Sequence, residues 1–413
     1  MRKLLLALLL AASATGIYAQ KLDDVKEKIQ KNKWDEAKEK IDKAMTDPKA
    51  SGNSEAWFYK AQIYHNLSKT NPDPSLSVAA LDAMKTYLKL EEKQPEGKRH
   101  LFSTLENHRT AFEIYTDYFK AGADNYNNKN YDKALQNFEK AIESFDLLKQ
   151  YNFTTATFDT TSVLYAGVAA EQLKNKDAAV KYYSKLADIK IPDTTYRGLY
   201  EYIISHYITQ KDDANARKYL DLGASVFPEY NGWLAFELDM VGDDKMKKLA
   251  KYEELIQKYP KNYELTVDYA IQYFNYTYSN ENKPADYAAR QAKLESSLKA
   301  AAAIKETALV NYLLSRHINN QIADLEEEKR SIKGTAAADV AKKKDLDTKI
   351  NQKYEELFTY SQKAYNLYSA QTDLKGADKI YYKEVTRDLV DYYQLKKNTA
   401  KVTEYQNKLK QLQ

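Results

Sequence analysis

The chain has 413 residues, no cysteine, and 63 basic against 59 acidic residues, a formal net charge of +4. This composition excludes disulfides, thiol catalysis and cysteine-ligated zinc, and so small a net charge leads us to expect no nucleic-acid partner. Only 11 glycines and 8 prolines interrupt a sequence that is 43% hydrophobic and 30% charged. It therefore predicts an almost wholly helical protein rather than a disordered one.

The first 19 residues have the pattern of an export signal. Residues 1–3 are a basic start, residues 4–12 are apolar, and small residues lead to Ala19. The apolar run is too short to span a bilayer. We therefore predict a signal peptide over residues 1–19, a periplasmic or envelope location, and no stable membrane insertion, since no other stretch is apolar enough.

The clearest helical pattern runs from Tyr118 to Ala141. Residues 118, 121, 122 and 125 share one face of a first helix, residues 127–130 form a polar break, and a matching face follows on a second helix. Gly122 and Ala134 are small where the two helices would cross closely. This order of small and aromatic residues resembles the second half of a tetratricopeptide repeat, a unit of about 34 residues.

The same phase recurs along the chain. Pro192, Pro228 and Pro260 close successive units at spacings of roughly 32 to 36 residues, which is the length of the repeat. Residues 55–95 give a further match. In the unit before Pro192, small and apolar side chains should face one another across the helix pair: Val163, Gly167 and Ala170 against Ala179, Tyr183 and Leu186.

The resemblance implies an all-α fold, a right-handed superhelical α-solenoid of antiparallel helix pairs. We predict tetratricopeptide-like repeats over residues 20–260 and degenerate repeats over 261–413. Within the second range, residues 307–368 are expected to form a long helical hairpin and residues 399–412 a capping helix. The stretch 97–126 is expected to be one long helix, with Leu101, Leu105, Phe112, Tyr115 and Phe119 on its buried stripe.

The sequence carries few signals for chemistry. None of the five histidines has another histidine or a cysteine at metal-ligand spacing, and the phosphate-loop, dinucleotide and nucleophile-elbow motifs are missing from the sequence. Carboxylate pairs lie near turns and lysines, as solvated surface residues do. We therefore expect a protein that is not an enzyme and uses neither a metal nor another cofactor.

In the resembled family, the first helix of each pair lines a concave face that binds peptides or helices of partner proteins. Aromatic residues among amides and carboxylates suit a peptide, because they offer apolar anchors and hydrogen bonds to its backbone. The positions just off the core stripe should form this face: Phe58, Gln62, His65, Asn66, Phe119, Tyr126, Asn127, Leu164, Glu171, Gln172, Glu201, Ser205 and Ile208.

These observations favour a non-enzymatic, exported scaffold that binds a protein or peptide at the bacterial cell envelope. An alternative is a structural or assembly subunit of an envelope or secretion complex, which would use its convex faces and the 307–368 hairpin. A third hypothesis is a hydrolase or glycan-binding protein, which would need a pocket of tyrosines around two close carboxylates. The partner, the oligomeric state, and periplasm versus exterior are left open by the sequence.

Overall fold

The computed structural model describes residues 21–279, 283–374 and 376–412, and the predicted export signal lies outside these ranges. Within them every regular element is a helix. The contacts divide the chain into two units, with the boundary between Trp233 and Leu234. Because each unit has its own packing, each is described by itself.

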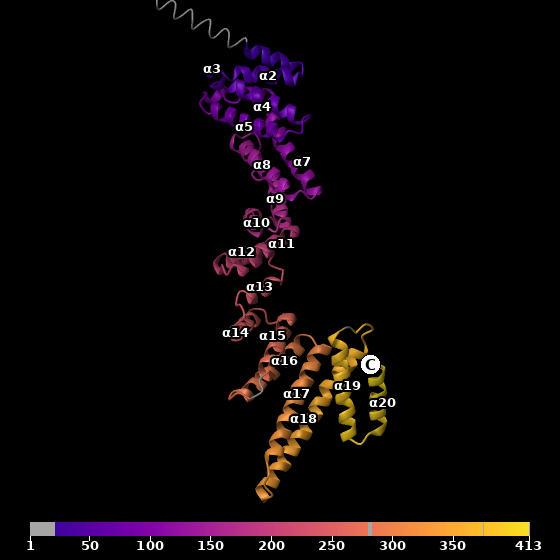
Figure 1. Cartoon of the computed structure of the whole chain (residues 1–413). Coiled ribbons are helices and arrows are strands. Elements are labelled where there is room, and N and C mark those ends of the chain that lie inside the picture. Colours follow the sequence, from indigo (N-terminus) through magenta and orange to yellow (C-terminus); the bar gives the residue numbers. More distant parts are fainter. Residues whose placement is uncertain (1–20, 280–282, 375, 413) are drawn as a thin grey trace, which may run out of the picture. The chain divides into compact units, whose positions relative to one another are not determined.

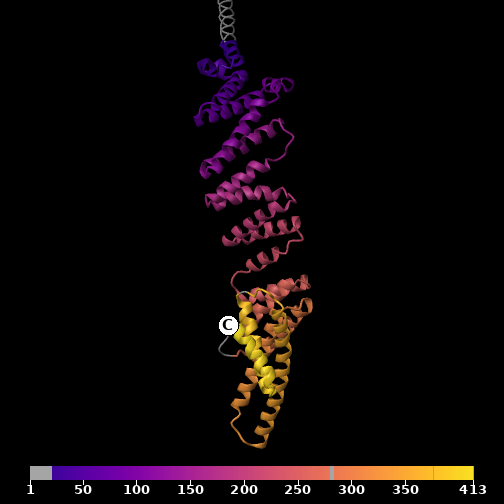
Figure 2. The same cartoon turned by 90° about the vertical axis from the view of Figure 1, so that its right-hand side faces the viewer.

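The first unit is a stack of antiparallel helix pairs, each packed on the next (Figure 1). Figure 2 shows these helices crossing back and forth along the unit. A helix over residues 21–30 precedes α2 (Trp34–Ala44) and the short α3 (Pro48–Ser51). The pairs that follow are α4 (Ser54–Ser68) with α5 (Pro74–Glu91), α7 (Arg109–Asn127) with α8 (Tyr131–Gln150), α9 (Thr160–Gln172) with α10 (Lys176–Asp188), and α11 (Arg197–Thr209) with α12 (Asp213–Val226).

The turns inside the last three of these pairs share one backbone conformation. Lys129, Lys174 and Lys211 each have a positive φ of 57° to 61°, and an Asn or Asp follows each of them directly. At Asn175 and Asp212 that side chain accepts a hydrogen bond from a backbone N–H of the next helix. The residue in the left-handed conformation ends the first helix, and the capping residue after it begins the second helix.

The predicted close helix crossings are confirmed. Gly122 of α7 lies against the ring of Phe138 on α8, and a Cβ at this position would be 2.7 Å from two of the ring carbons. The six residues predicted to face one another across α9 and α10 are all buried. The repeat arrangement therefore follows from small residues placed opposite aromatic ones.

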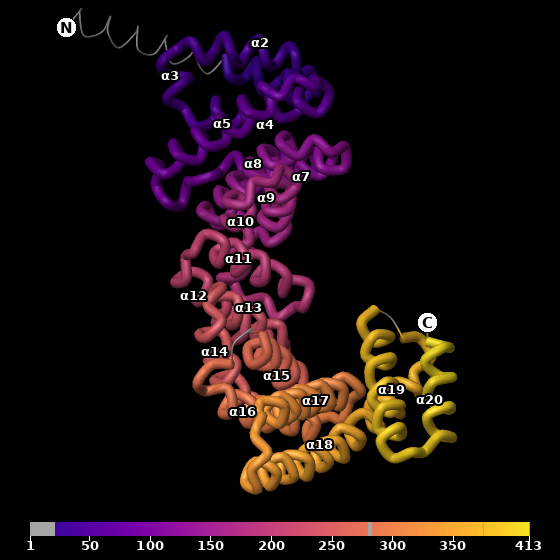
Figure 3. The backbone as a smooth tube through the Cα atoms, turned by 60° about the horizontal axis from the view of Figure 1, so that its bottom comes forward, coloured from indigo at the N-terminus to yellow at the C-terminus, as the bar shows by residue number. Residues whose placement is uncertain are grey.

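The second unit continues with helix pairs that differ in length. Its helices are α14 (Lys245–Lys258), α15 (Tyr263–Tyr278), α16 (Tyr287–Ile304), α17 (Ala308–Ser331), α18 (Ala337–Ser369), α19 (Ala377–Leu395) and α20 (Thr399–Gln411). A short helix, α13 (Trp233–Asp239), lies at the junction. Helices α17 and α18 lie side by side in Figure 3 and form the predicted hairpin.

The hairpin has a core of its own. Ile318 and Ile322 of α17 pack against Ile350 and Leu357 of α18. Nearer the tip, an acidic and a basic residue of the two helices form an ion pair, with Lys342 Nζ 3.0 Å from Glu328 Oε1. Among the described residues, no helix combines the length and the apolar character needed to cross a bilayer.

One helix prediction was wrong. Residues 97–126 do not form a single helix, because His100, Asn107 and His108 all have positive φ values and break it. The result is a 3-10 turn, η1 (Glu96–Lys98), a short helix, α6 (Leu101–Leu105), and then α7. Leu101 and Leu105 are exposed rather than buried.

The division between the units falls inside the predicted repeat that Pro260 closes, not after Pro260. This division follows the distribution of contacts between residues and not the repeat pattern of the sequence. The predicted repeat ranges, 20–260 and 261–413, therefore stay a prediction.

Candidate functional site

The regular stacking of the first unit is interrupted between α5 and α7. Their connection, residues 92–108, is long, and its Phe102 packs against the core that these helices share. There the ring of Phe153 stacks on His108 with centroids 3.8 Å apart, and His108 Nδ1 lies 2.8 Å from Ser103 Oγ. Helices α5 and α7 consequently share fewer contacts than α8 and α9 do.

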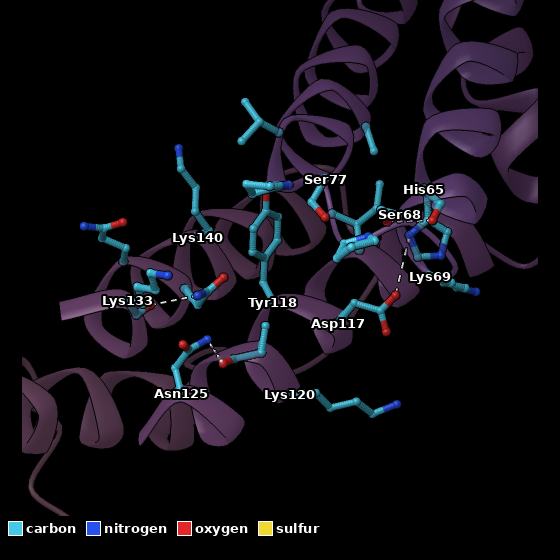
Figure 4. A pocket seen from close by; sticks show the side chains of 18 of the residues that line it. His65, Ser68, Lys69, Ser77, Asp117, Tyr118, Lys120, Asn125, Lys133 and Lys140 are labelled. Atoms are coloured by element: carbon cyan, nitrogen blue, oxygen red, sulfur yellow. Dashed lines mark hydrogen bonds and ion pairs between the residues drawn. The ribbon is translucent and has the colours of Figure 1, made fainter. Parts of the chain in front are cut away.

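The opposite end of this gap is open and forms a groove of about 950 Å³ (Figure 4). We call it the α5–α7 groove. It lies between the first half of α5, the second half of α7 and the first half of α8, with the end of α4 beside it. Its lining includes His65, Ser68, Lys69, Ser77, Val78, Asp117, Tyr118, Lys120, Asp124, Asn125, Lys133, Gln136, Asn137 and Lys140.

An ionic cluster holds the α4 side of the groove to α7. His65 Nε2 lies 2.9 Å from Glu113 Oε2, which is also 2.8 Å from Lys69 Nζ. His65 Nδ1 lies 3.7 Å from Asp117 Oδ2. Burial lowers the pKa of His65, and its bond to Glu113 opposes that effect. This side of the groove is therefore fixed by bonds between the two helices.

The other walls carry charges that are partly free. Lys140 pairs with Glu143 at 2.8 Å. Within the described ranges, Lys120, Lys133 and Asp124 have no partner at ion-pair distance. Side chains of both signs are thus available to a ligand along the groove.

Tyr118 is the most unusual residue of the lining. Its side chain is 7% exposed, and within the described part of the chain its hydroxyl oxygen has no hydrogen-bond partner. Burial raises the pKa of this hydroxyl to about 12, and the nearby carboxylates of Asp82 and Glu143 contribute to the rise. A buried hydroxyl without a partner costs about 1–3 kcal/mol. The groove therefore has, beneath its lining, a polar group that a ligand could satisfy once the side chains covering it shift.

Two side-chain amides are oriented by their own helices. Asn125 Nδ2 donates to the carbonyl of Ala121 at 2.8 Å, and Asn137 Nδ2 donates to that of Lys133 at 2.7 Å. Figure 4 shows both bonds at the groove. Since each amide is anchored through its nitrogen, its oxygen is left as an acceptor for a bound group.

The structure corrects part of the predicted concave face. Phe58 is buried against Tyr87 and Phe102, and His65 is only 2% exposed at the edge of the α5–α7 groove, so neither is presented on the predicted concave face. Gln62 is half-buried beside Glu106. Asn66 Nδ2 donates to the carbonyl of Gln62. These residues lie between helices because α4 packs against α6 and α7.

Other predicted residues do come together. Phe119 and Tyr126 of α7 both lie beside Tyr165 of α9, with ring centroids 6.2 Å and 6.4 Å away. Glu171 accepts a hydrogen bond from the Tyr183 hydroxyl at 2.7 Å. The prediction missed Tyr165, although it follows Leu164 directly. We call Phe119, Tyr126 and Tyr165 the aromatic cluster.

The remaining predicted residues are scattered around this cluster. Asn127, Gln172 and Ser205 are exposed, and Leu164 and Ile208 are half-buried. Glu201 is half-buried and lies 3.3 Å from Arg197 Nε. A binding role for these residues stays a prediction. The α5–α7 groove was not predicted, because no sequence pattern shows where two helix pairs stand apart.

Comparison with known proteins gives a likeness at the level of architecture. No family model and no curated protein matches the sequence. Among solved structures, a tetratricopeptide repeat protein from Parabacteroides merdae is 14% identical, covering 79% of this chain and 98% of its own, with a TM-score of 0.25. A TPR repeats protein from Bacteroides fragilis is 18% identical, covering 66% and 98%, with a TM-score of 0.26. The tetratricopeptide-repeat resemblance is confirmed for the helix-pair fold, which the contacts within each unit show directly.

Proposed function

We propose that this chain is a non-enzymatic helical-repeat scaffold that binds an extended segment of a partner protein in the α5–α7 groove. The observation that carries the proposal is a groove of about 950 Å³ lined by Tyr118, whose buried hydroxyl has no partner among the described residues. In the bound state, a shift of the side chains that cover this hydroxyl would let the ligand supply the missing hydrogen bond.

The surroundings of this hydroxyl favour a neutral group. Asp82 and Glu143 lie near it, and the two lysines Lys85 and Lys140 pair with Glu143 and balance these charges. A backbone amide of an extended chain is neutral and can donate and accept hydrogen bonds. The free lysines, Asp124 and the anchored amides would then contact side chains on either side of that amide. Grooves that bind peptides combine these two kinds of contact.

The proposal is tested by photo-crosslinking. Val78 lines the groove and is 45% exposed, so a photoreactive phenylalanine analogue in its place should crosslink to the bound segment. The same analogue at Leu173, which is 38% exposed and lies outside the lining, is the matched control. Sequencing the crosslinked peptide identifies the segment, and its synthetic copy should bind the unmodified chain. Equal crosslinking from both positions, or a synthetic copy that does not bind, would contradict the proposal.

We further propose that the chain is exported and works in the bacterial envelope. The support is the basic, apolar and small-residue order of residues 1–19. Mass spectrometry of the protein from its native cells should find a chain beginning at Gln20. A chain that retains Met1 and stays with the cytoplasmic fraction would contradict export.

The hairpin supports a second candidate function, that of an assembly subunit. Helices α17 and α18 extend beyond their neighbours in Figure 1 and pack on each other through Ile318, Ile322, Ile350 and Leu357. Deleting residues 326–344 and joining the ends with a short turn removes the tip and leaves that core in place. Under this function the shortened chain loses its complex, and under the groove function it keeps its ligand.

A further inference from the structure

On the α4 side of the α5–α7 groove, one histidine lies beside two carboxylates. Glu113 and Asp117 stand four residues apart on α7, so both can reach the same side chain of α4. His65 Nε2 is 2.9 Å from Glu113 Oε2, whereas its Nδ1 is 3.7 Å from Asp117 Oδ2, which is beyond hydrogen-bond distance. A dashed line joins His65 and Asp117 in Figure 4. The two ring nitrogens therefore have unequal contacts.

These contacts assign the hydrogen of the neutral His65 ring. A carboxylate only accepts hydrogen bonds, so the single N–H of the neutral ring lies on Nε2 and is donated to Glu113. Nδ1 then has a lone pair and offers no hydrogen bond to Asp117. Burial lowers the pKa of His65 from its ordinary value of about 6.5, so the ring is neutral at neutral pH.

With His65 neutral, the charge of Asp117 is left without a partner. The side chain of Asp117 is 38% exposed, lines the groove, and forms no hydrogen bond within the described ranges. Lys69 Nζ lies 2.8 Å from Glu113 and pairs with that carboxylate instead. Lys120, three residues further along α7, is not at ion-pair distance from Asp117. This side of the groove therefore offers a free carboxylate, which is complementary to a positive group.

We propose that Asp117 holds a lysine or arginine side chain of the bound segment while His65 is neutral, and loses it when His65 takes up a proton. The inference rests on the groove function proposed above and adds the class of residue that is recognised. A protonated ring has an N–H on both nitrogens. The new N–H faces Asp117 Oδ2, and a small movement of that side chain makes a charge-assisted hydrogen bond that replaces the bond to the ligand. His65 stays buried, so it is a positioning residue that acts on the ligand through Asp117.

The groups that act on His65 come from two helices. Burial has the largest effect on its pKa and lowers it, Glu113 and Asp117 of α7 raise it, and Lys69 of α4 lowers it. In the described part of the chain, no ionisable side chain of α2, α5 or α6 is at ion-pair distance from the ring. A cation bound to Asp117 competes with the protonated ring for one carboxylate. By reciprocity, ligand binding should lower the pKa of His65.

This linkage is tested by NMR of the full chain with carbon-13-labelled histidine, in which the His65 signal is the one lost in His65→Gln. The probe is an extended peptide of glycine and serine with one central lysine, and its counterpart with glutamine is the matched control. The lysine peptide should lower the midpoint of the His65 titration, and the glutamine peptide at equal ionic strength should leave it unchanged.

Two carboxylate variants show whether Asp117 carries the effect. Asp117→Asn should lower the His65 midpoint by about 1 pH unit, since it removes a negative charge near the ring, and should abolish the response to the lysine peptide. Asp124→Asn is the matched control, because Asp124 also lines the groove but lies seven residues further along α7. It should titrate like the unmodified chain. A midpoint that neither the lysine peptide nor Asp117→Asn moves would overturn the inference.

The segment recovered by crosslinking at Val78 gives a second measurement. It should contain a lysine or arginine whose replacement by glutamine weakens binding about two- to fivefold, the range for a partly exposed ion pair, at pH values above the His65 midpoint. Below the midpoint, and in Asp117→Asn at any pH, the replacement should have little effect. A segment that binds without a basic residue would overturn this inference and leave the groove function standing. If no specific segment is recovered, the groove function fails, and the titration alone decides whether Asp117 binds a cation.

Discussion

A methyl group on Gly167 would lie 2.4 Å from Cε1 of Tyr183. The ring is 2% exposed and its hydroxyl donates to Glu171, so it has little room to move. We therefore expect Gly167→Ala to lower the free energy of unfolding by about 1–3 kcal/mol, as inserted methyl groups do in packed cores. Urea denaturation followed by circular dichroism measures this difference.

Gly198 provides the matched control. It lies in α11, and a Cβ at this position would meet no atom within 4 Å. Gly198→Ala should raise the free energy of unfolding by up to about 1 kcal/mol, because alanine loses less backbone entropy in a helix. Similar effects of the two substitutions would show that the crossing at Gly167 is not tight.

Much of the fold could be predicted because residues within each repeat indicate where its helices cross and where they end. Gly122 and Gly167 stand at the predicted contacts, and the long 307–368 hairpin has the expected pairing of its two helices. These features depend on residues close in sequence. Small residues opposite aromatic ones can therefore be recognised without knowing the rest of the fold.

The break at residues 97–108 could not be predicted in the same way. Leu101 and Leu105 continue a helical spacing, but the backbone turns at His100 and His108 because contacts distant in sequence hold those turns. Phe153, after α8, stacks on His108. The α5–α7 groove follows from this break, so it too depends on long-range packing.

The groove proposal predicts opposite effects of Tyr118→Phe on stability and on binding. Removing a buried hydroxyl without a partner should leave the free energy of unfolding unchanged or raise it by about 1 kcal/mol. The crosslinked segment should bind about 2- to 12-fold more weakly, the range for one hydrogen bond. Denaturation and fluorescence anisotropy of a labelled synthetic segment measure the two quantities.

Tyr64→Phe is the control for that experiment. The Tyr64 hydroxyl donates to Asp42 at 2.7 Å, and Tyr64 is not part of the groove lining. This substitution should lower the free energy of unfolding by about 1 kcal/mol and leave the affinity unchanged. A Tyr118→Phe variant that binds as tightly as the unmodified chain would remove the main support for the groove.

Binding on the concave face and binding in the α5–α7 groove predict different effects of the same substitution on the affinity for the ligand. Tyr126→Ala/Gln172→Ala changes the predicted concave face and leaves the groove lining intact. If the segment lies in the groove, this variant should bind it with unchanged affinity. A loss of binding larger than about tenfold, with an unchanged circular dichroism spectrum, would instead place the ligand on the concave face. Phe119 is less suitable for this test, because its ring also packs against the buried Phe138.

We expect His317 to make the stability of the second unit dependent on pH. Its side chain is fully buried, with Nδ1 2.7 Å from the Tyr278 hydroxyl and Nε2 3.1 Å from Nε2 of Gln321. Burial lowers the pKa of His317 to about 4, and the nearby Glu295 only partly opposes this effect.

The sign of the pH effect follows from the lowered pKa. Between about pH 6.5 and pH 4 the unfolded chain binds a proton at His317 and the folded chain does not, so stability falls as the pH falls. The free energy of unfolding should decrease by about 3 kcal/mol across this window, at 1.36 kcal/mol per pH unit. Above pH 6.5 this contribution is fully present.

His317→Gln should be less stable at neutral pH, because it disturbs a packed site, but its stability should change less from about pH 6.5 to 4. Urea denaturation at several pH values compares the two slopes, and equal slopes would show that another group causes the dependence.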